Sequence, residues 1–208
     1  DFDIAIVNYN TREQSKDEVN YALELAKKYG KKIYLKELDL KSTSNFEKNA
    51  RDIRYSFFET IIKENSYETL ITAHQLNDRL EWFFMQLSKG AGVIELLGMN
   101  KFTNKKNYKI FRPLLDISKQ DLQDYLDKNG IKYFVDISNF DEKYRRNYFR
   151  KEFSNRFIDE FKAGTINSFK FLEDDLNSLN IKLNPIKTFE DLEVFEKLED
   201  DNLNLRVI

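Results

Sequence analysis

Apolar residues up to position 88 change between the two-residue spacing of strands and the three-to-four-residue spacing of helices. Short β-branched runs predict three strands, at 3–9, 32–38 and 68–73. Amphipathic spacing predicts three helices, at 15–29, 45–64 and 75–88. Because strands and helices alternate, this part of the chain is expected to form βαβ units around a parallel sheet.

Beyond position 88 the pattern becomes mainly helical. A glycine-bearing segment at 89–99 precedes a short strand at 108–112, which Pro113 ends. Ser118 and Asp121 have the spacing of a helix cap, and Gly130 that of a helix end. The remaining expected elements are a helix at 118–129, a loop at 136–147, a helix at 148–163 closed by Gly164, and helices at 168–179 and 188–200.

These patterns predict an α/β fold with a mostly helical C-terminal extension. The expected divisions are an α/β domain over 1–115, a helical continuation over 116–164 and a small helical appendage over 165–208.

Composition narrows the classes of function. The 208 residues include no Cys, which excludes disulfides, thiolate zinc sites, iron–sulfur ligation and a cysteine nucleophile. A single His argues against a His-rich metal site. No apolar run reaches the roughly eighteen residues of a membrane span, so no membrane partner is expected. The net charge of −2 does not indicate nucleic acid by itself but leaves local basic patches open.

The first candidate site is TAHQLNDRLEW at 72–82, where a predicted strand ends and a helix begins. On a helix, His74, Asp78 and Glu81 fall within one arc, opposite an apolar stripe that includes Leu80 and Leu87. The alternative is an ordinary solvated face. A metal site is a weaker interpretation because nitrogen and sulfur donors are few, and no metal ligand is assigned.

Three further segments are basic. Arg51 and Arg54 are one helical turn apart and suit phosphate or carboxylate, although a surface helix with a Glu47–Arg51 pair is the alternative. The segment 101–109 is either a basic hairpin that contacts RNA or a solvated loop.

The third basic segment interleaves arginines with tyrosines over 136–150, a pattern that suits RNA. Arg146 and Arg150 share a helical face. The alternative is that nearby acidic residues neutralise these arginines, namely Asp141, Glu142 and Glu152.

No glycine-rich phosphate loop occurs within 1–88, although α/β nucleotide sites often carry one after the first strand. The chain also lacks an initial Met. Either the protein binds no nucleotide, or a strand and loop lie upstream of Asp1, and the missing Met favours the second interpretation.

Together these motifs resemble the tRNA(Ile)-lysidine synthetase family of PP-loop (N-type) ATP pyrophosphatases. The resembling segments, in order, are EKNARDIRYSFF, TAHQLNDRLEWFFMQLSKGAGVIELLGM, FRPLLDISKQDLQDYL and DISNFDEKYRRNYFR, and the resemblance spans about 3–153.

The resemblance implies a Rossmann-like, nucleotide-binding PP-loop domain that uses ATP and Mg²⁺. It implies L-lysine and isoleucine tRNA as partners, with the wobble cytidine adenylated on its C2 oxygen and then attacked by the lysine ε-amine. A cytoplasmic location is expected. A homodimer is kept as an expectation, although the sequence does not fix the oligomeric state.

Residue by residue, the resemblance assigns three sets of positions. The catalytic set is His74, Asp78, Glu81 and Arg54. The ATP-binding set is Lys89, Gly90, Gly92 and Arg112, and the tRNA-binding set is Arg145, Arg146, Asn147 and Arg150. The chain departs from the family pattern at Gln75, Asn77 and Lys89, where His, Asp and Arg are usual.

Two alternatives remain. One is another PP-loop tRNA-modifying enzyme, such as a 2-thiocytidine synthetase, which the absence of Cys disfavours. The other is a non-catalytic RNA-binding fragment, which the absent phosphate loop suggests.

Overall fold

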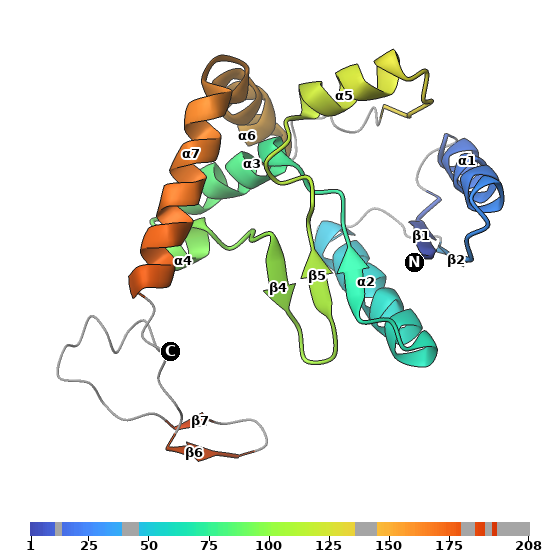
Figure 1. Cartoon of the computed structure of the whole chain (residues 1–208), viewed down its shortest axis with the longest axis horizontal. Coiled ribbons are helices and arrows are strands. Elements are labelled where there is room, and N and C mark those ends of the chain that lie inside the picture. Colours follow the sequence, from blue (N-terminus) through green and yellow to red (C-terminus); the bar gives the residue numbers. More distant parts are fainter. Residues whose placement is uncertain (11–13, 39–45, 136–144, 180–185, 190–192, 195–208) are drawn as a thin grey trace. The chain divides into compact units, whose positions relative to one another are not determined.

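The structure is a computed structural model of the chain (Figure 1). It describes all residues except 11–13, 39–45, 136–144, 180–185, 190–192 and 195–208, and nothing is stated of the side chains of 46–48 and 193. The described residues divide into two compact units. Unit 1 comprises Asp1–His74, Lys101–Pro113 and Gln123–Ile137, and unit 2 comprises Gln75–Asn100, Leu114–Leu122 and Ser138–Ile208. The domain boundaries expected from the sequence remain a prediction.

Unit 1 begins with a βαβ unit, as the sequence predicts. Strands β1 (Ile4–Asn8) and β2 (Ile33–Glu37) pair in parallel, with Ile4 opposite Ile33, and helix α1 (Ser15–Lys28) connects them. Gly30 follows the helix with a φ of 61°, a left-handed conformation that glycine adopts without strain.

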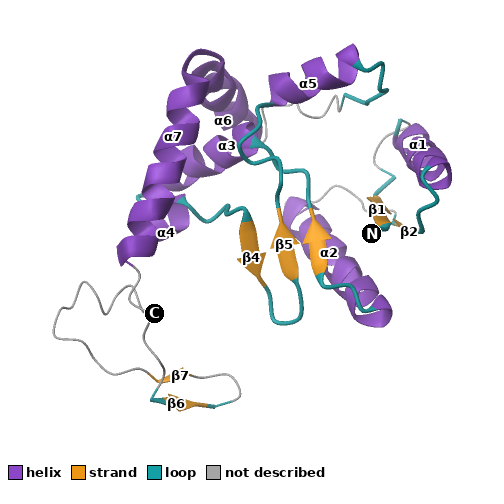
Figure 2. Cartoon of the chain, in the orientation of Figure 1, coloured by secondary structure: helices purple, strands orange, loops and turns teal. Residues whose placement is uncertain are grey.

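Among the described residues, unit 1 also contains a three-stranded sheet with the order β3-β5-β4 (Figure 2). Strand β3 (Thr69–Ile71) is parallel to β5 (Lys109–Phe111), which is antiparallel to β4 (Phe102–Asn104). The basic segment 101–109 therefore does form a hairpin, whereas its contact with RNA stays a prediction.

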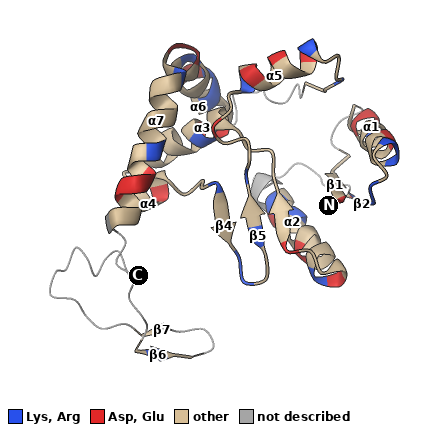
Figure 3. Cartoon of the chain, in the orientation of Figure 1, with Lys and Arg blue, Asp and Glu red and all other residues tan. Residues whose placement is uncertain are grey.

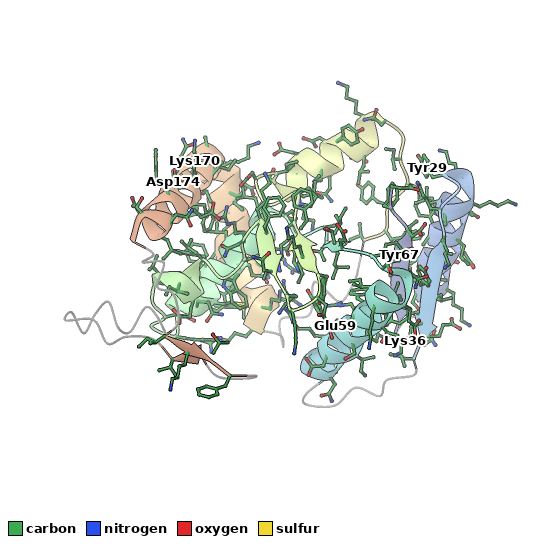
Figure 4. All side chains as sticks on the ribbon, turned by 60° about the horizontal axis from the view of Figure 1, so that its bottom comes forward. Tyr29, Lys36, Glu59, Tyr67, Lys170 and Asp174 are labelled. Carbon is green, nitrogen blue, oxygen red and sulfur yellow. The ribbon has the colours of Figure 1, made fainter. Side chains whose placement is uncertain are left out.

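Helix α2 (Phe46–Asn65) packs on this sheet, because buried Ile62 meets Tyr108 and Ile110 in one apolar cluster. The Tyr108 hydroxyl donates to Glu59 Oε1 at 3.2 Å. Figure 4 labels Glu59 on α2. Burial, with Glu59 nearby, raises the pKa of Tyr108 to about 12. Expected strands and the expected long helix are thus confirmed in unit 1.

Unit 2 is built around helix α3 (Leu76–Leu87) and helix α7 (Arg156–Leu179). Between them come α4 (Val93–Leu96), α6 (Arg145–Phe149) and the π-helix η2 (Arg150–Asn155). The apolar core of this unit consists of Leu76, Leu80, Leu97, Ile158 and Phe169. Helix α5 (Lys119–Lys128) begins in unit 2 at a cap in which Ser118 Oγ donates to Asp121 at 2.7 Å.

The predicted end of a helix at Gly164 is wrong. Helix α7 passes through Gly164 and continues to Leu179, with a kink at Phe161. Ile158, Thr165 and Phe169 are buried on both sides of the glycine. Burial of this continuous face outweighs the cost of about 1 kcal/mol for glycine within a helix.

Two other expectations are corrected. The segment 188–200 is not a helix throughout, because β6 (Lys187–Thr188) pairs antiparallel with β7 (Glu193–Val194); the rest of it lies outside the described residues. Cross-strand hydrogen bonding, including Ile186 N to Val194 O at 2.7 Å, replaces helical bonding there. The expected loop at 136–147 is wrong for positions 145–147, which are helical because α6 begins at Arg145. The contact of Arg146 with Glu81 stabilises that turn. Positions 136–144 lie outside the described residues.

Candidate active site

The first turn of α3 is fixed by its own polar side chains. Gln75 Oε1 accepts a hydrogen bond from Asn77 N at 2.9 Å, and Asp78 Oδ2 accepts one from Gln75 N at 3.0 Å. These bonds satisfy donors that a helix N-terminus otherwise leaves open. They also hold Asp78 so that Oδ1, its other oxygen, lies toward the arginines that follow.

Glu81 lies one turn further along α3 and is only 1% exposed. Its carboxylate accepts from Arg146 Nε, and from Arg150 Nε at 2.9 Å. Both arginines also lie near Asp78 Oδ1, at 3.7 Å and 3.9 Å from their Nη2 atoms. We call these four residues, Asp78, Glu81, Arg146 and Arg150, the carboxylate–arginine cluster.

Within the cluster, burial opposes ionisation of Glu81. Burial raises the pKa of Glu81, and Arg146 and Arg150 only partly counteract this effect. A carboxylate placed in this environment is costly for the fold unless its cationic partners remain in place.

The cluster confirms that Asp78 and Glu81 lie on one face of α3 and that Arg146 and Arg150 share a helical face. His74, however, is not on the helix, which begins at Leu76. The alternative of an ordinary solvated face is wrong for Glu81, which is buried. The predicted apolar stripe is also shorter than expected, because Leu87 is 51% exposed at the end of α3.

His74 and Arg112 lie at one edge of the sheet in unit 1. His74 comes shortly after β3, and Arg112 comes directly after β5, to which β3 is parallel. Thr72 N, just after β3, donates to the carbonyl of Phe111, the last residue of β5, at 3.0 Å. His74 Nδ1 is 2.9 Å from Thr72 Oγ1. Ligands of open α/β sheets bind at this carboxyl edge.

Arg112 is buried and donates to Thr103 Oγ1 at 2.8 Å. Burial lowers the pKa of Arg112, and nearby Arg51 lowers it further, while Tyr55 acts in the opposite direction. Burial raises the pKa of Tyr9, and the nearby positive charge of Arg54, also on α2, partly counteracts that rise. Arg51, Arg54 and Arg112 therefore make this part of unit 1 electropositive, which suits an anion.

The remaining predicted positions lie in unit 2. Lys89, Gly90 and Gly92 form the turn between α3 and α4, where Gly90 has a φ of 74°. Arg145 is exposed at the start of α6, with Nη2 3.4 Å from Ser88 Oγ, and Asn147 is half-buried on the same helix. Figure 3 shows the arginines of α6 in blue. Their roles toward ATP or tRNA stay predictions, and side-chain contacts of Glu47, Asp141 and Glu142 lie outside the described residues.

Sequence reasoning missed the buried amide of Asn77, which is 6% exposed and joins α3 to two other elements. A polar residue directly beside buried Leu76 was the available signal. In the described part of the chain, no three or more His, Asp or Glu side chains group as a metal site requires. The helices described also include none with both the length and the apolar composition to span a membrane.

Comparison with known proteins agrees with this fold. A family model described as a PP-loop domain matches residues 1–157. Among curated proteins, the tRNA(Ile)-lysidine synthase of Campylobacter jejuni strain RM1221 is 51% identical over 179 residues, which are 86% of this chain and 56% of that protein. The corresponding protein of Wolinella succinogenes is 40% identical over 207 residues, or 100% of this chain and 63% of its own length. The chain thus spans about half the length of several of the curated relatives it matches.

Among solved structures, the U34-tRNA thiolase NcsA from Methanococcus maripaludis with its [4Fe-4S] cluster matches with a TM-score of 0.63. The match covers 86% of this chain and 64% of that one, at 18% identity, and it supports the fold alone. With a family model covering most of the residues and an α/β fold of the expected kind, the chain belongs to the PP-loop domain family.

Proposed function

We propose that the protein attaches lysine to the wobble cytidine of an isoleucine tRNA in an ATP-dependent reaction. The observation that carries this proposal is the 51% identity to the tRNA(Ile)-lysidine synthase of Campylobacter jejuni over 179 residues. The carboxylate–arginine cluster supports it, because its negative and positive side chains suit the ammonium and carboxylate groups of an amino acid.

The proposed reaction has two steps. The C2 oxygen of cytidine attacks the α-phosphorus of ATP, and pyrophosphate leaves. The neutral ε-amine of lysine then attacks C2, the bond between C2 and the adenylated oxygen breaks, and AMP leaves with that oxygen. The amine must lose a proton for this step, so a nearby carboxylate is useful as acceptor.

The carboxylate–arginine cluster is proposed to hold lysine. Asp78 is assigned to its ammonium group, since charge-assisted hydrogen bonds to carboxylates are strong. Glu81, which was expected to share this role, is 1% exposed and contacts both arginines, so it is assigned to holding them beside Asp78. The arginine contacts of Asp78, at 3.7 Å and 3.9 Å, are longer than hydrogen bonds and can be replaced by an ammonium. Arg146 and Arg150 then neutralise the charge of Glu81. Together with Arg145 and Asn147, they are also proposed to bind tRNA phosphates.

Two groups of residues are proposed to bind ATP, and each group lies within a single unit. In unit 1, Arg54, Arg112 and His74 suit phosphates and the departing AMP. In unit 2, Lys89, Gly90 and Gly92 offer a cation and an open backbone turn. Mg²⁺ is assigned to the phosphates of ATP, because proteins usually bind it through few carboxylates together with substrate phosphates. Since tRNA is the proposed substrate, the cytoplasm is the proposed location.

The experiment is lysine incorporation into an isoleucine tRNA transcript by the natural full-length protein, with pyrophosphate release measured in parallel. We expect incorporation to require ATP. Asp78→Asn should raise KM for lysine at least about tenfold, the effect of losing a charged hydrogen bond, with KM for ATP changed far less. Asp175→Asn, an exposed change of the same chemistry on α7, is the matched control.

Two results would contradict the proposal. Absence of lysine incorporation by well-folded full-length protein would refute the activity. Equal changes in KM for lysine and for ATP in Asp78→Asn would refute the assignment of Asp78 while leaving the activity intact. Sedimentation velocity on the same protein tests the expected homodimer.

A further inference from the structure

The side-chain amide of Asn77 connects three elements of unit 2. Its Nδ2 donates to Asn155 Oδ1 at 2.8 Å, and its Oδ1 accepts from Lys119 N at 2.9 Å. Asn77 belongs to α3, Asn155 ends η2, and Lys119 begins α5. Because Asn77 is 6% exposed, water cannot readily replace these bonds.

The direction of the Asn77–Asn155 bond is determined by its surroundings. A backbone N–H only donates, so Lys119 requires the oxygen of the Asn77 amide. The nitrogen of Asn77 therefore faces Asn155, which must present its own oxygen. The pair consists of one donor and one acceptor in a fixed arrangement.

This pair lies at the opposite end of η2 from the carboxylate–arginine cluster. The π-helix has six residues, and its first, Arg150, contacts Glu81 of α3. Its last, Asn155, contacts Asn77 of α3. Two polar contacts at the two ends thus set where η2 lies along α3. A π-helix is intrinsically uncommon, so contacts from outside it are needed to keep its wide turn.

We propose that the Asn77–Asn155 pair is a positioning element that sets Arg150 on Glu81, and thereby sets the spacing of the charges that receive lysine. Neither asparagine touches the reacting atoms in this proposal. Its consequence for catalysis rests on the proposed function, whereas its consequence for the Arg150–Glu81 contact does not.

Substitution by aspartate separates loss of the bond from loss of side-chain size. In Asn77→Asp, the Asn155 amide can turn and donate, and in Asn155→Asp, Asn77 still donates; each single variant keeps one donor facing one acceptor. The double variant places two carboxylates at this contact and has no donor. Asn167→Asp with Asn177→Asp adds the same two charges at exposed positions of α7 and is the matched control.

The first measurement is steady-state lysine incorporation by the natural full-length protein at a temperature where circular dichroism shows every variant folded. We expect less than a threefold change in KM for lysine in each single variant and in the control. The double variant should raise KM for lysine at least tenfold, with KM for ATP within threefold. A folded double variant with unchanged KM and kcat would overturn the positioning role while leaving the proposed function standing.

The second measurement needs no activity. The coupling between Glu81→Gln and Arg150→Gln is obtained from urea unfolding of both single variants and the pair. We expect this coupling to fall below half its value when measured in the Asn77→Asp/Asn155→Asp background, and to be unchanged in the control background. Unchanged coupling in both backgrounds would overturn the proposal even if the protein proved to have another activity.

Discussion

At the scale of single residues, Glu81 shows how this chain places charge inside unit 2. A carboxylate with 1% of its surface exposed loses most of its hydration, and Arg146 and Arg150 return only part of that energy. Arg79 lies on nearly the opposite side of α3 from Glu81 and is also buried. It pairs with Glu173, and its guanidinium carbon is 4.2 Å from the ring centroid of Phe169. Ionic side chains thus connect α3 to both α6 and α7.

The raised pKa of Glu81 predicts a pH dependence of stability. The unfolded chain releases this proton near the ordinary value of 4.5, whereas the folded chain keeps it to higher pH. The folded state therefore binds more protons, and the favourable contribution is fully present below pH 4.5 and lost as pH rises through the folded pKa. Relative to Glu81→Gln, wild-type protein should lose free energy of unfolding as the pH rises above 4.5.

Urea unfolding at several pH values tests this expectation. Glu160→Gln, an exposed change on α7, should show no such trend relative to wild type. If the free energy of unfolding of wild type instead rose relative to that of Glu81→Gln as the pH increased, the two arginines would lower the pKa of Glu81 overall.

At the scale of elements, helix α3 shows the limit of an apolar pattern. Leu76 and Leu80 are buried in the core of unit 2, whereas Leu87, on the same predicted stripe, is 51% exposed. The helix ends at Leu87, where the chain turns through Lys89 and Gly90 toward α4. Periodicity therefore identifies the buried face but not where along the helix packing stops.

This difference gives a matched pair of variants on one helix. Leu80→Ala should lower the free energy of unfolding by about 3 kcal/mol, from lost apolar burial and the cavity left behind. Leu87→Ala should change it by less than about 0.5 kcal/mol. Thermal or urea unfolding of both variants tests this; similar losses would show that Leu87 is covered in the folded protein.

The elements also show what the sequence determines locally. Strands β1, β2, β3 and β5, the α1 helix and the cap at Ser118 depend on neighbouring residues, and each was predicted, whereas β4 was not predicted as a strand. The contact of Glu81 with Arg146 joins positions 65 apart in the sequence, so spacing identified the face that the arginines share but not the carboxylate that they contact. The π-helix and the passage of α7 through Gly164 depend on packing between residues distant in sequence, which explains why periodicity failed there. The β6–β7 pair joins residues only five to seven positions apart, and a strand of two residues is too short to show a periodic pattern.

At the scale of the whole molecule, the net charge of −2 means that any binding of RNA depends on local cations. The segment from α6 to the start of α7 also carries exposed basic side chains that do not contact Glu81. Lys151 and Arg156 have side chains that are 62% and 74% exposed, and both lie near Glu152, at 4.0 Å and 3.8 Å from its carboxylate oxygens. Arg145 is exposed as well. These residues lie beside Arg146 and Arg150, which the proposed function brings to tRNA.

Arg145→Ala should therefore weaken tRNA binding and reduce the slope of log K against log salt by roughly one. Binding curves at three or more salt concentrations give this slope. Lys170→Ala, on α7 (Figure 4), is the control and should change neither quantity measurably. An unchanged slope in Arg145→Ala would assign this arginine to the structure around Ser88 instead.

The wide turn of η2 holds one residue more than an α-helix would over nearly the same rotation. Ser154 Oγ reaches the carbonyl of Phe149, five residues back, which reflects this extra residue. Deleting one residue from 150–155 would restore α-helical winding, and because the rotation is nearly the same, Ile158 would still face the core of unit 2. The deletion would instead change the spacing between Arg150 and Asn155, the two residues of η2 that contact α3. The extra residue therefore matters for the charges beside α3 and not for the burial of α7.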